Sequence, residues 1–304
     1  MDPLLVITNK DAGTADQETL EVALGILRGR TSVEVAATSD PGELDGVLQR
    51  AGSRRIVVAG GDGSLHAVVS VLHRRMQLGS SVLALLPLGT GNDFARGVGI
   101  PLDIEDAARI VVEGEVRETD LIVDEVGEIV VNNVHVGAGA EASRRGSTWK
   151  KRLGSIGIGK LNLGKIGYPI GALQSAVHPA DLHLCVEVDG EVVNDVDRPV
   201  LMVAVGNGAN IGGGTEVTPH ADPESGTIDV MVSRSTAPLA KLSYTLKMAR
   251  AGSHLERPDV DYYRGRTVSV SGEAFWCSAD GEVYGPERHR TWHIEPAAYS
   301  MLLP

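Results

Sequence analysis

The sequence of 304 residues has few cysteines, few aromatic residues and a shortage of positive charge. Its two cysteines, Cys185 and Cys277, are too few and too far apart for a disulfide framework or a zinc knuckle, which favours a reduced, cytoplasmic setting. Aromatic residues make up 4% of the chain, too small a share for platforms that stack on unpaired bases. Because 28 basic residues stand against 40 acidic ones, the net charge of −12 argues against nucleic acid as a partner.

Long hydrophobic runs are also missing. No apolar stretch approaches the roughly 18 residues that a membrane-spanning helix needs. The first residues lack the basic region and the long apolar run of a signal peptide. We therefore expect a cytoplasmic protein whose contact with a membrane is peripheral, and a length that suits two compact domains or one large one.

Apolar segments and helical patterns alternate over the first third of the chain. Strands are expected at 4–8, 32–37, 55–59 and 82–87, and helices at 15–28, 41–51, 64–76 and 103–113. This alternation predicts an α/β domain over 1–121 with a doubly wound, mostly parallel sheet. Ligands of such sheets bind at the carboxyl ends of the strands.

From about residue 117 the pattern changes to strand-like runs with few long helices. Strands are expected at 117–125, 128–136, 182–188, 191–196, 199–206, 227–233, 266–271, 274–279 and 290–295, and one helix at 238–251. The pair Asp189-Gly190 between two alternating runs predicts a tight hairpin. We expect a second domain over 122–287 that forms an antiparallel β-sandwich.

The segment 143–166 is basic in an otherwise acidic chain. It carries seven arginines and lysines, no acidic residue, and interspersed glycines and apolar side chains such as Trp149 and Leu153. Two interpretations stay open: a solvated loop, or a surface that docks on an anionic membrane, where each basic residue contributes about 1 kcal/mol.

Two glycine-rich loops follow apolar runs. The first comprises Gly60, Gly61, Asp62, Gly63 and Ser64, and a helical pattern follows it. Glycines at such a junction let several backbone N–H groups converge on one anion. An aspartate there would repel a phosphate unless a divalent cation or a hydroxyl stood between them, which points to a Mg²⁺–nucleotide enzyme. The alternative is a plain turn in which Ser64 caps the helix.

The second loop runs from Gly89 through Thr90, Gly91 and Asn92 to Asp93. Thr90 can donate to a phosphate oxygen, and Asp93 can bind Mg²⁺ through water. The alternative is a long connection to the helix at 103–113. The residues 9–13 follow the first strand at the same expected edge, where they form a plausible phosphate cradle. Taken alone, 207–214 is a glycine-rich connection and 278–282 a hairpin turn.

With Pro87 to Arg96 after the first loop, the chain resembles the catalytic domain of the diacylglycerol kinase and sphingosine kinase family, and most closely the soluble bacterial diacylglycerol kinases. The resemblance extends to Asn207-Gly208, Gly212 to Gly214, Pro219, Ala221, Gly226, Asp229 and Asp280-Gly281-Glu282, so it covers nearly the whole chain.

The resemblance implies ATP and Mg²⁺ in a cleft between two domains, and a final segment, 288–304, that returns to the first domain. It implies that the following residues line the bound nucleotide: Asn9, Lys10, Asp11, Ala12, Gly13, Thr38, Gly60, Gly61, Gly63, Ser64, Leu65, His66, Ala67, Gly89, Thr90 and Asn92. It makes Glu282 the base for the lipid hydroxyl, with Asp62, Asp93 and Asp280 as further catalytic residues. It assigns a second, structural Mg²⁺ to Asp222, Ser225 and Thr227.

The chain departs from the family pattern at three places. His66 and Ala67 stand where the family usually has Asn-Glu, which removes a carboxylate beside the nucleotide. Ser64 replaces a threonine and keeps the hydroxyl. Ser225 replaces an aspartate that would be the better Mg²⁺ ligand.

The expected activity is transfer of the ATP γ-phosphate to the primary hydroxyl of a lipid at a membrane surface, with diacylglycerol as the first choice and phosphatidic acid as its product. One alternative is an enzyme similar to NAD kinases, which share the first loop and the two-domain plan. Another is a nucleotide- or lipid-binding protein that has lost catalysis. The expected partner is a lipid, and a homodimer is possible.

Overall fold

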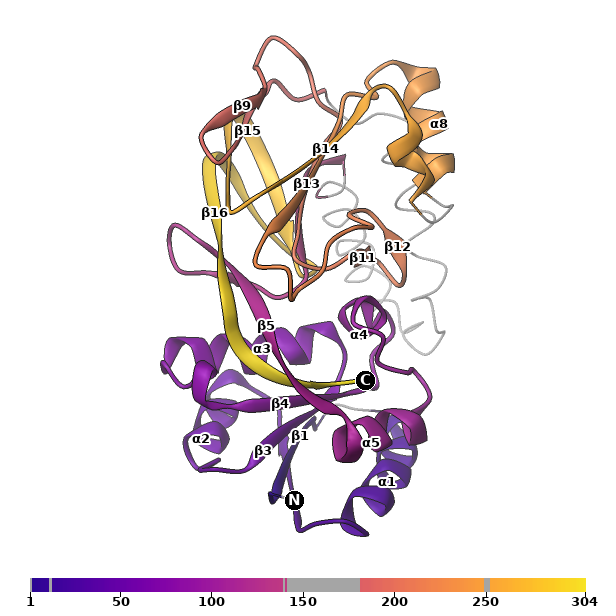
Figure 1. The fold of residues 1–304 in the computed structure, drawn as a ribbon, viewed down its shortest axis with the longest axis vertical. Helices are drawn as coiled ribbons and strands as arrows, with labels where there is room; N and C mark the ends of the chain where they lie inside the picture. Colours follow the sequence, from indigo (N-terminus) through magenta and orange to yellow (C-terminus); the bar gives the residue numbers. More distant parts are fainter. Residues whose placement is uncertain (1, 11–12, 139, 141–180, 249–251) are drawn as a thin grey trace, which may run out of the picture. The chain divides into compact units, whose positions relative to one another are not determined.

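The computed structural model describes residues 2–10, 13–138, 140, 181–248 and 252–304. The chain divides into two compact units (Figure 1). The first comprises Met1–Leu121, Asp222–Gly226 and Glu295–Pro304, and the second comprises Ile122–Ala221 and Thr227–Ile294. The basic segment 143–166, considered above as a docking surface, lies outside the described residues.

The first unit is built on a mostly parallel sheet. Its strands are β1 Leu4–Asn9, β2 Val33–Thr38, β3 Arg55–Gly60 and β4 Val82–Pro87, in the order β4-β3-β1-β2. Beside β4, Ser300 and Met301 near the end of the long strand β16 Glu282–Leu303 add a further parallel partner. Most residues of β1, β3 and β4 are buried, which explains their almost continuous apolar sequences.

Helices cover both faces of this sheet. They are α1 Thr14–Arg28, α2 Pro41–Gln49, α3 Asp62–Arg74, α4 Asp93–Gly97 and α5 Ile104–Glu113, with a 3₁₀ turn at Leu78–Ser80. The helix α1 packs with α5, and α2 packs with α3, on opposite sides of the strands (Figure 1). Asp40 and Asp103 cap α2 and α5, because each carboxylate accepts two backbone N–H groups of the first turn. The predicted doubly wound α/β fold is confirmed.

The second unit is an antiparallel β-sandwich, as predicted. Its strands are β5 Glu115–Asp124 (shared with the first unit), β6 Ile129–Val130, β7 Asn133–Gly137, β8 Leu184–Val188, β9 Glu191–Asn194, β10 Met202–Gly206, β11 Asn210–Ile211, β12 Thr215–Glu216, β13 Ile228–Ser233, β14 Val260–Gly265, β15 Thr267–Ala279 and the first part of β16. One path runs β14-β13-β10-β7-β15.

The strand β15 belongs to two pairings at once. Its first half, Val268–Gly272, pairs with β8, and its last residues, Cys277–Ala279, pair with β7. Register shifts lie between Ser271 and Cys277, where the strand bends. The sequence predicted two separate strands, at 266–271 and 274–279, but they form one strand. The bend interrupts the alternation of apolar and polar residues without ending the strand.

The apolar faces of β10 and β13 are both buried. Val203 and Val205 point into the sandwich core, whose largest side chain is Trp292. Met202 and Ala204 point to the opposite face, which the helix α8 Pro238–Met248 covers. Because both faces of β10 and β13 are buried, their sequences are almost continuously apolar and do not alternate with polar residues.

The predicted hairpin at Asp189-Gly190 is confirmed. Both residues have positive φ, +51° and +82°, and they join β8 directly to β9. In the described part of the chain, none of the helices is long and apolar enough to cross a bilayer.

Candidate active site

The predicted nucleotide loops of the first unit all start at one edge of the sheet. Asn9 is in register with Thr38, and Gly60 is in register with Pro87, so the strands β1 to β4 end level with one another. The structure therefore brings Asn9, Thr38 and the two glycine-rich loops to the carboxyl edge, where parallel sheets bind ligands. Asp11 and Ala12 lie outside the described residues.

The two glycine-rich loops touch through their backbones. A Cβ on Gly89 would stand 2.4 Å from the Cα of Gly61, and a Cβ on Gly61 would stand 2.9 Å from the Cα of Gly89. A Cβ on Gly60 would stand 2.3 Å from the Oγ of Ser64. These three glycines are therefore required by packing inside the chain itself.

Gly63 is different from the other three glycines. It lies in the first turn of α3, and a Cβ placed there would meet nothing within 4 Å. Glycine in a helix costs roughly 1 kcal/mol relative to alanine, and no neighbouring atom of the chain demands it. Gly63 lies at a helix start, where the N–H groups of Ser64 and Leu65 are already bonded to the carbonyl of Gly61, at 3.0 and 3.1 Å; helix starts of this kind bind phosphates through their first N–H groups. This feature fits a nucleotide.

Asp62 ties the first loop to the second. Its Oδ2 accepts a hydrogen bond from the backbone N–H of Asp93, and its Oδ1 accepts one from Phe94, each at 3.0 Å. The carboxylate thus caps α4 from another part of the chain. Each carboxylate oxygen keeps a second lone pair, so this bonding leaves acceptor capacity for a water or a metal ion.

Asn92 organises the second loop. Its backbone is left-handed, with φ +52°. Its Oδ1 accepts from the N–H of Gly89 at 3.0 Å, while its Nδ2 donates to the carbonyl groups of Pro87 and Gly89 at 3.2 and 2.8 Å. Thr90 remains exposed at the loop's tip, and Asp93 is 8% exposed.

Other predicted nucleotide residues have mixed environments. The side chain of Leu65 is fully buried in the core, so only its backbone is available to a ligand. His66 and Ala67 are half-buried on α3, and Gly13 is the N-cap of α1. Lys10 donates to both carboxylate oxygens of Glu43, at 2.7 and 2.8 Å.

The contact between Lys10 and Glu43 affects the carboxyl group's titration. Together with bonds from Ser39, the Lys10 ammonium lowers the pKa of Glu43 to about 2. Lys10 therefore has an anionic partner on the surface at neutral pH. A phosphate near this edge would compete with Glu43 for the ammonium.

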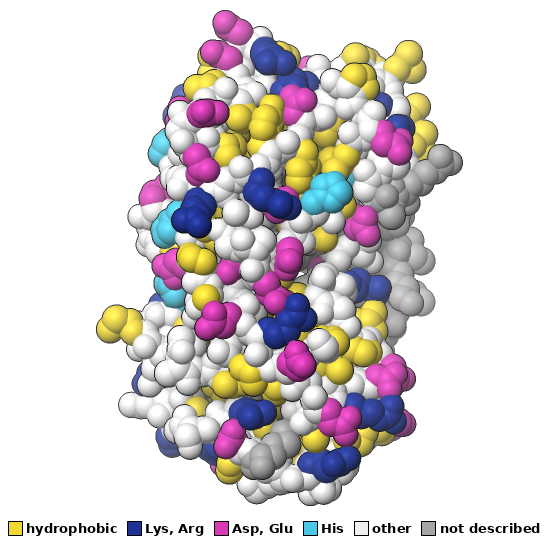
Figure 2. Space-filling model, in the orientation of Figure 1, with side chains coloured by type: hydrophobic (Ala, Val, Ile, Leu, Met, Phe, Trp, Pro, Cys, Tyr) yellow, Lys and Arg dark blue, Asp and Glu magenta, His cyan; other side chains and the backbone are white. Residues whose placement is uncertain are grey.

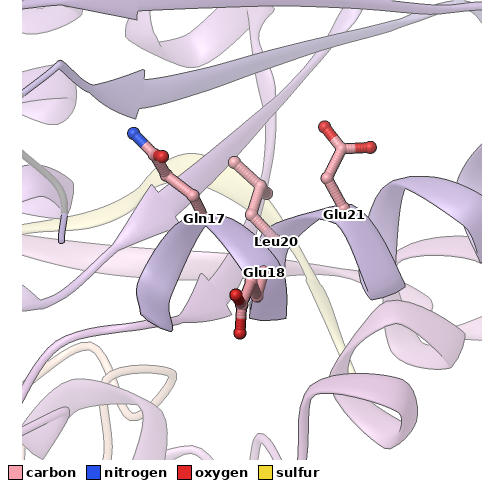
Figure 3. Close-up of a pocket in the computed structure, with 4 residues that line it drawn as sticks. All are labelled: Gln17, Glu18, Leu20 and Glu21. Atoms are coloured by element: carbon pink, nitrogen blue, oxygen red, sulfur yellow. The ribbon is translucent and has the colours of Figure 1, made fainter. Parts of the chain in front are cut away.

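A hollow along α1 does not suit the same ligand. Gln17, Glu18, Leu20 and Glu21 line it, and their side chains include two carboxylates (Figure 3). Glu21 is paired with Arg28 at 3.2 Å, and none of the four lining side chains is basic, so the hollow offers no cation of its own lining to a polyphosphate.

In the second unit, the predicted catalytic tripeptide Asp280-Gly281-Glu282 forms a two-residue hairpin turn. Asp280 and Gly281 have φ of +46° and +89°, and Ala279 is paired with Glu282. The Asp280 carboxylate accepts three backbone N–H groups: those of Val131 at 2.7 Å, Asn132 at 2.9 Å and Asn133 at 3.2 Å. Glu282 itself is exposed. Asp280 therefore holds the turn that presents Glu282.

The same tripeptide occurs a second time, at Asp189-Gly190-Glu191. That turn has the same backbone conformation, and the Asp189 carboxylate likewise accepts backbone N–H groups, from Arg266 and Thr267, at 2.8 Å each. Local sequence thus cannot distinguish the two turns. They differ in what surrounds them.

A group of asparagines surrounds the Asp280 turn, and the sequence analysis did not single it out as a unit. Asn132 and Asn133 both donate their side-chain amides to the carbonyl of Asn210, at 2.7 and 2.8 Å. The backbone N–H groups of Asn207 and Gly208 donate to the carbonyl of Asn132 at 2.8 Å. A Cβ on Gly208 would stand 2.0 Å from the Oδ1 of Asn132, so glycine is required there. The connection 207–214 is thereby fixed against the turn.

His135 lies on β7, two residues after Asn133 and in register with Ser278 of β15. Its side chain is almost fully buried, and burial lowers its pKa to about 4, although the charge of Asp280 partly offsets this effect. The imidazole is therefore neutral at physiological pH.

Residues at the predicted structural metal site are already engaged in contacts within the protein. Asp222 accepts the N–H of Glu224 at 3.1 Å, and the Glu224 carboxylate pairs with Arg117 at 2.7 Å. Asp120 fixes the same loop, because its carboxylate accepts the N–H groups of Gly226 at 2.6 Å and Ala297 at 2.8 Å. Of the three predicted ligands only Asp222 carries a carboxylate, and Ser225 and Thr227 carry hydroxyls, which is a poor donor set for Mg²⁺.

Comparison with known proteins agrees with these observations. The family model described as the diacylglycerol kinase catalytic domain matches residues 3–123, and the YegS C-terminal NAD kinase beta sandwich-like domain matches 133–303. A probable YegS-like lipid kinase of Xanthomonas oryzae is 31% identical over 99% of this chain and 95% of its own. The chain therefore belongs to the family of diacylglycerol kinases and YegS-like lipid kinases.

Two further proteins extend the comparison. A diacylglycerol kinase of Staphylococcus carnosus is 26% identical over 76% of this chain and 70% of its own. A crystal structure of a putative diacylglycerol kinase from Bacillus anthracis superposes with a TM-score of 0.79, covers 100% of this chain and 97% of that one, and is 22% identical, which shows a shared fold.

Proposed function

We propose that this protein is an ATP-dependent lipid kinase that transfers the γ-phosphate to the primary hydroxyl of diacylglycerol and so forms phosphatidic acid. The observation that carries the proposal is Gly63, a helical glycine that its own chain does not need, placed at the edge where two interlocked loops end. Membership in a lipid kinase family supports an acceptor with a lipid tail.

The phosphates of ATP are held by the first unit in this proposal. Backbone N–H groups at the start of α3 and the hydroxyl of exposed Thr90 donate to phosphate oxygens. Mg²⁺ brought with the nucleotide would neutralise phosphate charge, and Asp62 and Asp93 would hold it through water. Phosphoryl transfer requires little covalent chemistry from the protein, because positioning and charge neutralisation supply most of the catalysis.

Glu282 is the proposed general base. Its carboxylate takes the proton of the lipid hydroxyl while the hydroxyl oxygen bonds to the γ-phosphorus and the bond to the leaving ADP oxygen breaks. Its exposed position on a rigid turn suits this task, since the carboxylate is accessible and Asp280 fixes the backbone beneath it. A positioned base contributes roughly 10²–10⁴-fold to rate.

A labelling experiment tests the proposal. The protein is incubated with Mg²⁺ and γ-labelled ATP, with diacylglycerol, ceramide or NAD offered separately, and the labelled product is identified. We expect labelled phosphatidic acid. Labelled NADP would show that the protein phosphorylates NAD, and would contradict the proposed lipid acceptor. Binding of ATP without transfer to any acceptor would contradict catalysis altogether.

A further inference from the structure

The two glycine-rich loops contain a single basic residue. Over 60–64 and 89–97, the charged side chains are those of Asp62, Asp93 and Arg96. Arg96 is exposed and lies on the short helix α4, which begins at Asp93 and whose first turn is capped by the Asp62 carboxylate. The same piece of structure therefore carries one cation beside two aspartates.

The side chain of Arg96 folds back along α4 toward the tip of the second loop. Its Nε donates a hydrogen bond to the carbonyl of Gly91 at 3.2 Å. Side chains of a helix lean toward its N-terminus, and this bond fixes Arg96 in that direction. The guanidinium is thus held next to Gly91, the residue after Thr90. It does not lie over the last carbonyl groups of α4, where a basic residue would serve the helix dipole alone.

Arg96 also differs from most arginines of the first unit in its partners. Figure 2 shows acidic and basic side chains interspersed over one face of the molecule. Ion pairs with carboxylates engage Arg28, Arg30, Arg54, Arg55, Arg75, Arg109 and Arg117. Among the described residues, Arg96 has no acidic partner, and its bond to Gly91 uses one of the five N–H groups of the guanidinium. The N–H groups of its two terminal nitrogens are therefore available to a ligand.

The chemistry of a guanidinium at this place favours a phosphate. Arginine N–H groups match the oxygens of a phosphate and can bind two of them at once. Mg²⁺ neutralises only part of the charge of a triphosphate, and Asp62 and Asp93 add negative charge to the same loops. A positive side chain at the tip of the second loop would reduce the repulsion that remains.

We propose that Arg96 is a phosphate-binding residue of the nucleotide site, and that its terminal N–H groups donate to oxygens of the ATP triphosphate. This inference rests on the nucleotide site of the proposed function and adds to it the one cation of the two loops. A membrane phospholipid is another source of the same phosphate chemistry. The nucleotide is favoured because the bond to Gly91 directs the guanidinium to the loop tip that carries Thr90.

Calorimetric titration tests this contact without lipid and without turnover. The probes are ATP and inorganic tripolyphosphate, each with Mg²⁺. The variant is Arg96→Gln, because the amide nitrogen of glutamine takes the place of the arginine Nε and can still donate to Gly91, while the charge is lost.

The matched control is Arg74→Gln. Arg74 is the last residue of α3, at the opposite end of the helix from the first glycine-rich loop. It too is without an acidic partner in the described part of the chain, and its guanidinium donates to the Oγ of Ser70 at 3.3 Å. Thermal unfolding verifies that both variants are folded.

We expect Arg96→Gln to bind both probes at least about tenfold more weakly than the unmodified protein, and Arg74→Gln to bind them with unchanged affinity. Full affinity in Arg96→Gln would overturn the proposal. An equal loss in both variants would also overturn it, because the removal of any surface charge would then explain the effect.

Vesicle co-sedimentation distinguishes the two sources of phosphate. Vesicles of phosphatidylcholine with phosphatidylglycerol, offered without nucleotide, should sediment Arg96→Gln and the unmodified protein to the same extent. Weaker sedimentation of Arg96→Gln, together with unchanged affinity for tripolyphosphate, would assign the arginine to a lipid phosphate and contradict the proposal.

The labelling experiment separates this inference from the proposed function. If the unmodified protein phosphorylates no lipid yet binds tripolyphosphate through Arg96, the proposed function fails and the phosphate contact stands. If labelled phosphatidic acid forms while Arg96→Gln keeps full affinity for both probes, the function stands and Arg96 has no part in the nucleotide site.

Discussion

The carboxylate of Asp62 and the backbone N–H of Asp93 form a 3.0 Å hydrogen bond that links the two glycine-rich loops of the first unit. A second bond, from Phe94 to the other oxygen of Asp62, makes the link bidentate. The carboxylate of Asp62 in the first loop thus caps the first turn of α4, the helix that begins at Asp93 of the second loop. Asp62 therefore contributes to the geometry of both loops.

Replacement of Asp62 by alanine should therefore destabilise the protein as well as inactivate it. Two N–H groups at the start of α4 would lose their acceptor, at a cost of about 1–3 kcal/mol. Chemical denaturation measures this loss. Asp62→Asn keeps one acceptor oxygen, so it should lose less stability while activity still falls. Unchanged stability in Asp62→Ala would contradict the capping role.

Gly63 and Gly89 should respond to alanine in opposite ways. In Gly63→Ala the new Cβ enters open space on a helix, so stability should be unchanged or higher, while ATP affinity falls at least about tenfold. In Gly89→Ala the Cβ would stand 2.4 Å from Gly61, which should cost about 1–3 kcal/mol of stability. Thermal unfolding and calorimetric titration with ATP measure both effects. Normal ATP affinity in Gly63→Ala would contradict the proposal that ATP binds beside Gly63.

Glu282→Gln should lower the turnover number by roughly 10²-fold or more, because the amide cannot take the proton of the acceptor hydroxyl. Stability and ATP affinity should be retained, since the side chain is exposed. Glu191→Gln is the matched control: it alters the last residue of the other Asp-Gly-Glu turn, in the same conformation and also exposed. Equal turnover in the two variants would exclude Glu282 as the base.

The buried imidazole of His135 should make the protein less stable in acid. Its pKa is about 4 in the folded state and about 6.5 in the unfolded chain, so between these values the unfolded state binds more protons. Stability should fall as the pH drops from 6.5 toward 4, by on the order of 3 kcal/mol in total from this group. Denaturant titrations across this range, compared with His135→Asn, isolate the contribution. An identical pH dependence in the variant would contradict it.

Much of the first unit was accessible from sequence. The alternation of apolar and helical segments predicted β1 to β4 and the major helices to within a few residues, because each element is long and strongly patterned. The short helix α4 was not predicted, since its start depends on Asp62, a residue 31 positions earlier. The continuous course of β15 was also missed, because its bend depends on two partner strands.

For the candidate site, the sequence alone determined the residue types: glycines and aspartates after two strands, and a turn that ends in glutamate. It also determined, through β/α alternation, that the first two loops share one edge. Tertiary structure decided which glycines serve packing and which leaves room for a ligand, since that depends on atoms from another loop. It likewise distinguished the two Asp-Gly-Glu turns, because only contacts between distant strands surround Asp280 with asparagines.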